Sequence, residues 1–285
     1  MEPTTSDHEP KTTKWDEGQI YVKACHNATR KLLVCLLSCS NEKKLNLTTA
    51  GLDLSSGGSP DYGPRFVEPF SHDKMREYVE REQPWDERDI HSLNILDIPK
   101  LYKYRRWNNA VHVIGVLHGT LNNFWGYDAP YRIADEDNEL GSVYPMQGQW
   151  YLEGWTTAKD TSQPHINAFV ADSQPHRVGR LNSGEVSLAY GLIAKRRLQE
   201  GYNDHRYIPI TMFSVSDFTV RILQIWHDKQ NPKALQIRSS RIMDFKDGVQ
   251  NNLDDWVTIL CWMTGEPVGD TKNGTEVVKV IEQEE

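Results

Sequence analysis

The side chains with the clearest chemical potential lie in the C-terminal half of the chain. Glu185 falls in the first turn of an expected helix, where a carboxylate suits the positive end of the helix dipole. Gln236 and Arg238 alternate in an expected strand, so their side chains share one face of it. This polar row faces either the solvent or a site at the sheet, and Glu185 is expected to belong to the same site.

Two clusters of cations could bind phosphates. The first lies on the polar surface of a helix expected to begin near Asp97, and the second ends a helix expected between Asn182 and Gly201. The cations concerned are Arg105 and Arg106 in the first cluster and Lys195, Arg196 and Arg197 in the second. A solvated helix face explains the first cluster and helix C-terminal electrostatics explain the second. The alternative is that both converge on one nucleic-acid surface, with aromatic residues interleaved in the first.

The elements that must position these side chains follow the order α-β-β-β-α-β over residues 182–281. A helix, NSGEVSLAYGLIAKRRLQEG, is predicted to be amphipathic and precedes three runs dense in β-branched and aromatic residues, YIPITMFSV, FTVRILQIWH and KALQIRSSRI. A second helix, NNLDDWVTILCWMTG, and a last strand, TEVVKVIE, follow. Upstream, 149–155 and 165–172 predict a strand hairpin, and 72–82 predicts a short helix capped by Ser71.

These elements predict an α/β or α+β protein with a mixed sheet flanked by helices. Residues 1–14 are polar and are expected to form a disordered tail, and 15–285 are expected to form a single domain around the 182–281 core. No apolar run approaches the length of a bilayer span, and the N-terminus does not resemble a signal peptide. The four cysteines show no zinc-finger spacing, so free thiols in the cytoplasm are expected. The net charge of −8 excludes a generally polycationic nucleic-acid coat but allows a local basic groove.

The order of the C-terminal elements resembles the core of the PD-(D/E)XK nuclease superfamily. The resemblance implies an acid on the first helix, which Glu185 matches, and an Asp on the second strand, for which Asp217 is the nearest candidate. It also implies a Glu-x-Lys on the third strand, where this chain has Gln236-Ile237-Arg238. Gln binds a hard cation less well than a carboxylate does, and Arg cannot shuttle a proton. The fold is therefore expected without a metal site, and nuclease chemistry is doubtful.

The runs HRYIPITMFS, TVRILQIWHD and LQIRSSRIMDF resemble the C-terminal part of the fungal arginine-containing cyclodipeptide synthases. That resemblance implies natural-product biosynthesis by a transferase that joins arginine from arginyl-tRNA with a second aminoacyl group into a diketopiperazine. Aminoacyl esters are already activated, so no ATP or other cofactor is expected, and no phosphate-binding glycine loop occurs.

Binding of an arginyl side chain would require a carboxylate and often an aromatic wall. The candidates are Glu153 with Trp155, and Asp172 at the end of a strand. The sequence thus predicts a tRNA-dependent cyclodipeptide synthase with aminoacyl-tRNA partners and no membrane. The alternatives are a metal-dependent nuclease, whose magnesium-dependent cleavage Glu185→Ala would abolish, and a non-catalytic nucleic-acid-binding module. The second amino acid, the acid–base residues and the oligomeric state do not follow from the sequence.

Overall fold

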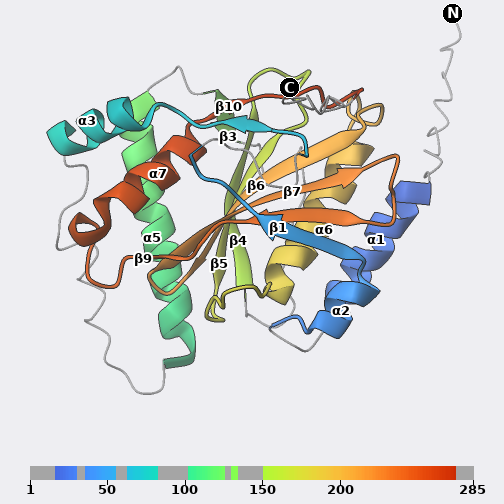
Figure 1. Cartoon of the computed structure of the whole chain (residues 1–285), viewed down its shortest axis with the longest axis horizontal. Helices are drawn as coiled ribbons and strands as arrows, with labels where there is room; N and C mark the ends of the chain where they lie inside the picture. Colours follow the sequence, from blue (N-terminus) through green and yellow to red (C-terminus); the bar gives the residue numbers. More distant parts are fainter. Residues whose placement is uncertain are drawn as a thin grey trace, which may run out of the picture.

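A mixed sheet of eight strands forms the centre of the computed structural model, which describes residues 17–30, 36–55, 63–82, 102–125, 130–133 and 150–273 (Figure 1). The strand order is β1-β8-β7-β6-β5-β4-β3, and β9 pairs with β7 off this path. The strands are β1 (Leu47–Gly51), β3 (Tyr131–Ile133), β4 (Trp150–Ala158), β5 (Ile166–Asp172), β6 (Tyr207–Ser216), β7 (Thr219–Asp228), β8 (Leu235–Ser239) and β9 (Met243–Asp244). This architecture confirms the predicted α+β class with a mixed sheet.

Helices cover both faces of the sheet. One face packs against α1 and α6, and the other packs against α3, α5 and α7. The helices are α1 (Glu17–Arg30), α2 (Cys39–Lys44), α3 (His72–Glu82), α5 (Tyr102–Trp125), α6 (Ser183–Leu198) and α7 (Leu253–Met263), with a short 3-10 helix at Gln250–Asn252. A small ribbon formed by β2 (Val67–Glu68) and β10 (Glu266–Pro267) lies apart from the main sheet.

The predicted C-terminal order is present from α6 through β6, β7 and β8 to α7. Both strand pairs, β6 with β7 and β7 with β8, are antiparallel, as a meander requires. A two-residue turn joins β6 to β7, and its first residue, Asp217, adopts the left-handed conformation with φ 56°. The last predicted strand, at 274–282, lies outside the described residues, as does the tail at 1–14.

The strands are buried because their alternate side chains pack into two separate layers. Ile208, Ile210 and Met212 of β6 face α6, whereas Phe213 and Val215 face the layer of α5 and α7. All ten residues of β6 are buried, as expected for a central strand covered on both faces. The alternation fixes the face of each polar side chain, because a neighbour in sequence points the opposite way.

The expectation of an amphipathic helix at 182–201 is wrong. Helix α6 is buried on nearly every side, including its basic C-terminal turn, where Arg196 and Arg197 are buried. The reason is that α1 packs on α6 from outside: Val22 and Cys25 of α1 join the same apolar cluster as α6. A helix between a sheet and a second helix needs no polar face.

The upstream predictions fit the structure in most places. β4 and β5 form the expected antiparallel hairpin, with an irregularity between Leu152 and Gly154. Helix α3 matches the prediction at 72–82, and the Ser71 carbonyl accepts from the Met75 N–H in its first turn. β1, which was not predicted, extends the meander by pairing in parallel with β8. None of the helices that the structure describes combines the length and apolarity that a bilayer span requires.

Replacing Gly184 with Ala is expected to destabilise the protein, although Gly-to-Ala changes usually stabilise helices. An added Cβ would lie 2.5 Å from Cγ of Trp150, so the indole or α6 must move. Such overpacking costs about 1–3 kcal/mol. Gly115 in α5 is the matched control because open space surrounds its Cβ position. Gly115→Ala should raise the free energy of unfolding by about 0.5–1 kcal/mol. Urea denaturation measures both, and a Gly184→Ala variant as stable as the parent contradicts this packing.

Candidate functional site

The predicted helix acid is locked into the protein interior. Glu185 is 0% exposed, and its Oε2 accepts from the backbone N–H of Asn182 at 2.8 Å, which caps the start of α6. The Arg221 guanidinium on β7 contacts both carboxylate oxygens, with 2.7 Å between Nε and Oε1. Arg221 is 2% exposed, and its Nη1 donates to the Arg180 carbonyl at 2.7 Å. Burial alone would raise the pKa of Glu185, but Arg221, His176 and the Ser214 hydroxyl together more than offset burial, so the pKa lies below its usual range.

Further polar groups surround this ion pair at the start of α6. Asp172, at the end of β5, accepts from the Gln174 N–H at 2.8 Å and from Asn182 Nδ2 at 3.2 Å. His176 Nε2 lies 3.1 Å from the Ser214 hydroxyl. We call this set the α6 N-terminal cluster; it consists of Asp172, His176, Asn182, Glu185, Ser214 and Arg221. Its side chains are almost completely buried, so no substrate reaches them in this conformation.

Burial sets the ionisation of the remaining cluster members. It lowers the pKa of His176 to about 3, with the Arg221 charge acting in the same direction, so the imidazole is neutral at physiological pH. Burial raises the pKa of Asp172 to about 7. The permanent charges of the cluster are therefore those of Glu185 and Arg221, and they neutralise each other. This arrangement holds the helix to the sheet.

The third-strand residues lie on the opposite face of the sheet. Arg238 is buried; its Nη1 donates to Gln224 Oε1 at 2.8 Å and to the Pro64 carbonyl at 2.7 Å. The guanidinium also lies 4.5 Å from the centre of the Trp226 ring. Gln224 and Trp226 face away from α6, whereas Arg221 faces it. The sheet therefore separates Arg238 and Gln236 from Glu185, and the expected single polar site is not assembled.

Asp217 is also remote from Gln236. In the β6–β7 turn its N–H donates to the Arg106 carbonyl at 3.2 Å, and its Oδ1 accepts from Asn109 Nδ2 at 2.6 Å. These bonds fasten the hairpin to α5. The turn lies about 20 Å along β7 from Trp226, the partner of Gln236, at roughly 3.3 Å per residue. In this conformation, the positions matched to the nuclease motif do not form one set of metal ligands.

The second basic cluster is structural rather than exposed. Arg196 and Arg197 are each 1% exposed. Arg197 donates to the carbonyls of His205 and Arg206 at 3.0 Å each, and Arg196 stacks on the Tyr202 ring at 4.5 Å. The prediction that both arginines contact phosphate is wrong for this conformation. Lys195 is half-buried, and burial lowers its pKa.

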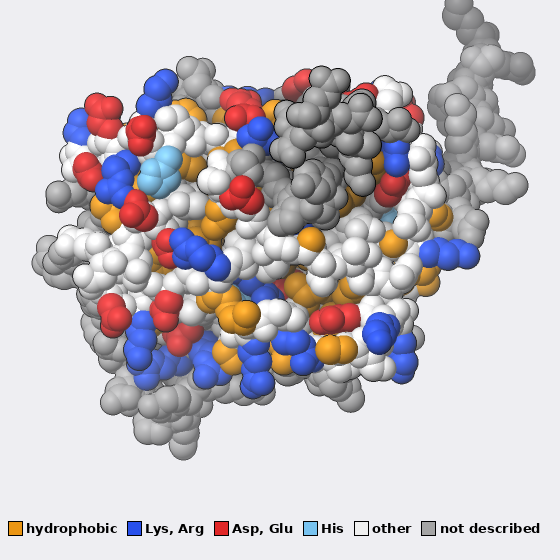
Figure 2. Space-filling model, in the orientation of Figure 1, with side chains coloured by type: hydrophobic (Ala, Val, Ile, Leu, Met, Phe, Trp, Pro, Cys, Tyr) orange, Lys and Arg blue, Asp and Glu red, His pale blue; other side chains and the backbone are white. Residues whose placement is uncertain are grey.

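The first basic cluster remains exposed, at the other end of β6. Arg105 and Arg106 are exposed in the first turns of α5, beside the Asp217 turn that follows β6. Arg197, in contrast, contacts Arg206, which precedes β6. The two clusters therefore do not converge. Figure 2 shows Lys and Arg side chains gathered along the lower edge of the molecule, the edge at which α5 begins in Figure 1.

Asp172 and Trp155, two of the predicted substrate-binding residues, do not meet either. Glu153 is half-buried at the β4 irregularity, burial raises its pKa, and its Oε1 has no hydrogen-bond partner among the described residues. Trp155 packs against the apolar layer on the α6 side. Asp172 belongs to the α6 N-terminal cluster and pairs across the sheet with Trp150, whereas Trp155 pairs with Ala168. The structure separates Asp172 from Trp155, whereas Glu153 lies two residues from Trp155 on the same strand.

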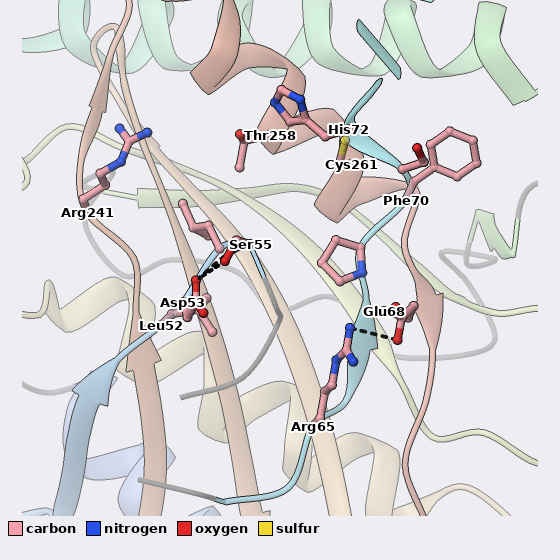
Figure 3. Close-up of a pocket in the computed structure, with 13 residues that line it drawn as sticks. Leu52, Asp53, Ser55, Arg65, Glu68, Phe70, His72, Arg241, Thr258 and Cys261 are labelled. Atoms are coloured by element: carbon pink, nitrogen blue, oxygen red, sulfur yellow. Dashed lines mark hydrogen bonds and ion pairs between the residues drawn. The ribbon is translucent and has the colours of Figure 1, made fainter. Parts of the chain in front are cut away.

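An open pocket of about 730 Å³ lies elsewhere, between the chain that follows β1, the β2 segment and α7 (Figure 3). We call it the β1–β2–α7 pocket. Its polar lining comes from four separate parts of the chain: Asp53, Ser55, Arg65, Glu68, Ser71, His72, Arg241 and Thr258. Its apolar lining is Leu52, Leu54, Pro69 and Phe70, with Cys261 at its wall. Sequence reasoning missed this pocket because no spacing links these segments.

The charged groups of the pocket are already organised. Arg65 Nη2 lies 2.8 Å from Glu68 Oε2. Asp53 Oδ1 accepts from the backbone N–H of Ser55 at 3.0 Å and from its hydroxyl at 2.7 Å. Arg241 forms a two-point ion pair with Asp255, which does not line the pocket. Burial raises the pKa of the Cys261 thiol to about 12, so this residue is not a thiolate nucleophile.

Within the described ranges, no group of three or more His, Cys, Asp or Glu side chains is placed to hold a metal ion. The described cysteines, Cys25, Cys39 and Cys261, are free thiols. Comparison with protein-family models, with curated proteins and with solved structures finds no match to this chain. The site must therefore be interpreted from its own geometry.

Removing Arg221 is expected to be far more damaging than removing a surface arginine. Arg221→Leu leaves the Glu185 carboxylate buried without its cation, which costs about 3–5 kcal/mol. The double variant Glu185→Leu, Arg221→Leu should recover part of this loss because it leaves no unpaired charge. Arg81→Leu, which breaks the exposed Arg81–Glu82 pair, should cost at most about 1 kcal/mol. Chemical denaturation tests this, and equal losses for Arg221→Leu and Arg81→Leu contradict a structural role for the buried pair.

Asp172 should make the protein less stable as pH rises. Its folded-state pKa of about 7 lies above the ordinary value of 3.8, so the folded state holds the proton more tightly than the unfolded state. Stability relative to Asp172→Asn should fall between about pH 4 and 7, by about 1.4 kcal/mol for each unit of pKa difference, and then level off. Thermal melts of both proteins from pH 5 to 8 measure this. A difference in melting temperature that does not change with pH would contradict the buried, protonated carboxyl.

Proposed function

We propose that this chain is a tRNA-dependent cyclodipeptide synthase that joins arginine from arginyl-tRNA with a second aminoacyl group. The observation that carries the proposal is that the three runs resembling the synthases form β6, β7 and β8, an antiparallel meander in the α6-β6-β7-β8-α7 order expected from the nuclease-superfamily resemblance. A fold by itself does not establish an activity. The proposal therefore depends on what the side chains on this scaffold can and cannot do.

The side chains disfavour the nuclease alternative. A nuclease of this class needs its helix acid and its strand residues around one metal ion. Here Arg221 neutralises Glu185, and the sheet separates that pair from Gln236 and Arg238. This chain keeps the strand order of that nuclease class but uses Glu185 and Arg238 for internal hydrogen bonds. Such a scaffold suits a reaction that needs no set of metal ligands.

Cyclodipeptide formation from aminoacyl esters is such a reaction. The α-amine of one aminoacyl group attacks the ester carbonyl of the other, forms an amide and releases the first tRNA through its ribose oxygen, which takes up the proton. The α-amine of the resulting dipeptidyl ester then closes the ring and releases the second tRNA. Both steps exchange an ester for an amide, so neither oxidation nor ATP is required. The protein must chiefly bind and orient the two esters.

Two features of the structure suit these substrates. The β1–β2–α7 pocket, at about 730 Å³, is in the usual size range for small-molecule sites and can accept an aminoacyl group. The exposed Arg105 and Arg106 offer phosphate contacts on a chain whose net charge is −8. On this proposal, Arg105 and Arg106 bind tRNA, while Arg196 and Arg197 only support the fold.

The test is product analysis with the purified chain, arginyl-tRNA and a mixture of other aminoacyl-tRNAs. We expect mass spectrometry to detect an arginine-containing diketopiperazine, and ribonuclease treatment of the tRNAs before the reaction to abolish it. Arg105→Ala with Arg106→Ala should reduce the yield at moderate salt and leave the melting temperature unchanged, because both side chains are exposed.

Three outcomes would contradict the proposal. Absence of any diketopiperazine with all charged tRNAs present rejects the activity. Salt-dependent tRNA binding without turnover indicates a binding module instead. Magnesium-dependent cleavage of nucleic acid that Glu185→Gln abolishes, in a variant that remains folded by circular dichroism, indicates the nuclease.

A further inference from the structure

We propose that the exposed surface beside the β6–β7 turn binds the phosphate backbone of a nucleic acid, and that Arg106 and Arg177 are its two contacts. We call this the turn surface. As a phosphate-binding surface it stands on the structure around the turn. Its identification with tRNA rests on the proposed function.

Two segments far apart in the sequence meet at the β6–β7 turn, and each carries an exposed arginine. The start of α5 is held by the Asp217 N–H, which donates to the Arg106 carbonyl at 3.2 Å. The loop between β5 and α6 is held by His176, whose Nδ1 lies 3.1 Å from the Thr219 hydroxyl. Arg177 follows His176 directly, and both arginines are exposed. Figure 1 shows both segments at the lower edge of the molecule.

The segment that carries Arg177 is held in a turn by hydrogen bonds. The Arg180 N–H donates to the Arg177 carbonyl at 3.2 Å, and Gly179 between them has φ 67°, a conformation that glycine adopts without strain. Arg180 anchors the turn, because its Nε donates to the Leu37 carbonyl at 3.1 Å and its own carbonyl accepts from Arg221 at 2.7 Å. Arg177 can therefore contact a ligand without the entropic cost of ordering its segment.

Arg106 and Arg177 differ from the other arginines in having no side-chain partner among the described residues. Of the arginine side chains that the structure describes, only these two form no hydrogen bond, ion pair or ring contact. Exposed arginines elsewhere are paired, for example Arg81 with Glu82 at 2.8 Å. A guanidinium without a partner offers all five donors, and its planar fork matches a phosphate group. Both arginines are thus available to an anion on another molecule.

The acids around the turn do not pair with these two arginines. Asp217 Oδ1 accepts from Asn109 Nδ2 at 2.6 Å. The segment after β9, which pairs with the start of β7, carries the exposed Lys246 between Asp244 and Asp247. Asp244 Oδ1 accepts from the Lys246 backbone N–H at 2.9 Å. That segment supplies no excess positive charge, so the phosphate contacts are those of the two arginines.

A nucleic-acid backbone suits two arginines that come from separate segments. They need not reach the same phosphate, because a duplex carries one charge about every 1.7 Å along its axis. Phosphate contacts position a protein without reading the sequence. On the proposed function this is what the enzyme requires, because it accepts two different aminoacyl-tRNAs.

The experiment is fluorescence anisotropy of labelled, deacylated tRNA with the full chain, between about 50 and 200 mM salt. Arg106→Ala and Arg177→Ala should each reduce the slope of log affinity against log salt by about 0.9, and the double variant by about twice as much. Lys74→Ala is the control for lost charge, because Lys74 is exposed on α3, at the upper edge in Figure 1. Val178→Ala is the control for the Arg177 turn, because Val178 is uncharged and 90% exposed. Both controls should keep the parent slope.

Four results would overturn the turn surface. The first is absence of tRNA binding by the parent chain. The second is the parent slope in either arginine variant, because the surface needs both segments. The third is a loss of affinity without a change of slope, which indicates a structural effect. The fourth is binding to vesicles of phosphatidylcholine and phosphatidylserine, but not to tRNA, that the double variant abolishes; this would assign the arginines to a membrane.

Failure of the turn surface can be told apart from failure of the proposed function. If tRNA binds with slopes that depend on Arg106 and Arg177 but charged tRNAs give no diketopiperazine, the surface stands and the synthase activity is rejected. If the diketopiperazine forms and both arginine variants bind tRNA with the parent slope, the activity stands and the turn surface is overturned.

Discussion

The buried ion pair between Glu185 and Arg221 is the constraint on which the arrangement of this protein depends. It joins the first turn of α6 to β7, and the Asn182 N–H and the Arg180 carbonyl complete its hydrogen bonds. A buried charge is tolerated only when it is paired and fully bonded, so the pair permits one register of α6 against the sheet. Because β7 lies at the centre of the meander, the pair also fixes how the helix meets its strands.

The sheet separates a closed face on the α6 side from a face that opens in part at the β1–β2–α7 pocket. On the α6 side, the arginines at the C-terminal end of α6 also serve internal bonds, so both ends of that helix are anchored. On the other side, the Arg238 guanidinium holds the carbonyl of Pro64, the residue next to Arg65 of the pocket wall. Arg238 therefore links the sheet to the segment that forms the pocket wall, although Arg238 does not line the pocket.

Much of the fold could be predicted from the sequence, but little of the site could. Dense β-branched runs and an acid in the first turn of α6 predict elements, because these signals are local. Local signals do not show that α1 covers α6, so Arg196 and Arg197 were expected at the surface. They also do not show which face of the sheet receives α6, so Glu185 and Arg238 were expected together. One signal was available: Arg221 lies within an apolar strand, where a charge requires a buried partner.

On the proposed function, arginine enters the reaction as a tRNA ester rather than as the free amino acid. The most direct measurement supplies the purified chain with tRNA carrying isotopically labelled arginine, together with an excess of unlabelled free arginine and a second aminoacyl-tRNA. We expect the diketopiperazine to carry the full label, because the ester alone is activated. A product whose label is diluted in proportion to the free arginine would contradict the account.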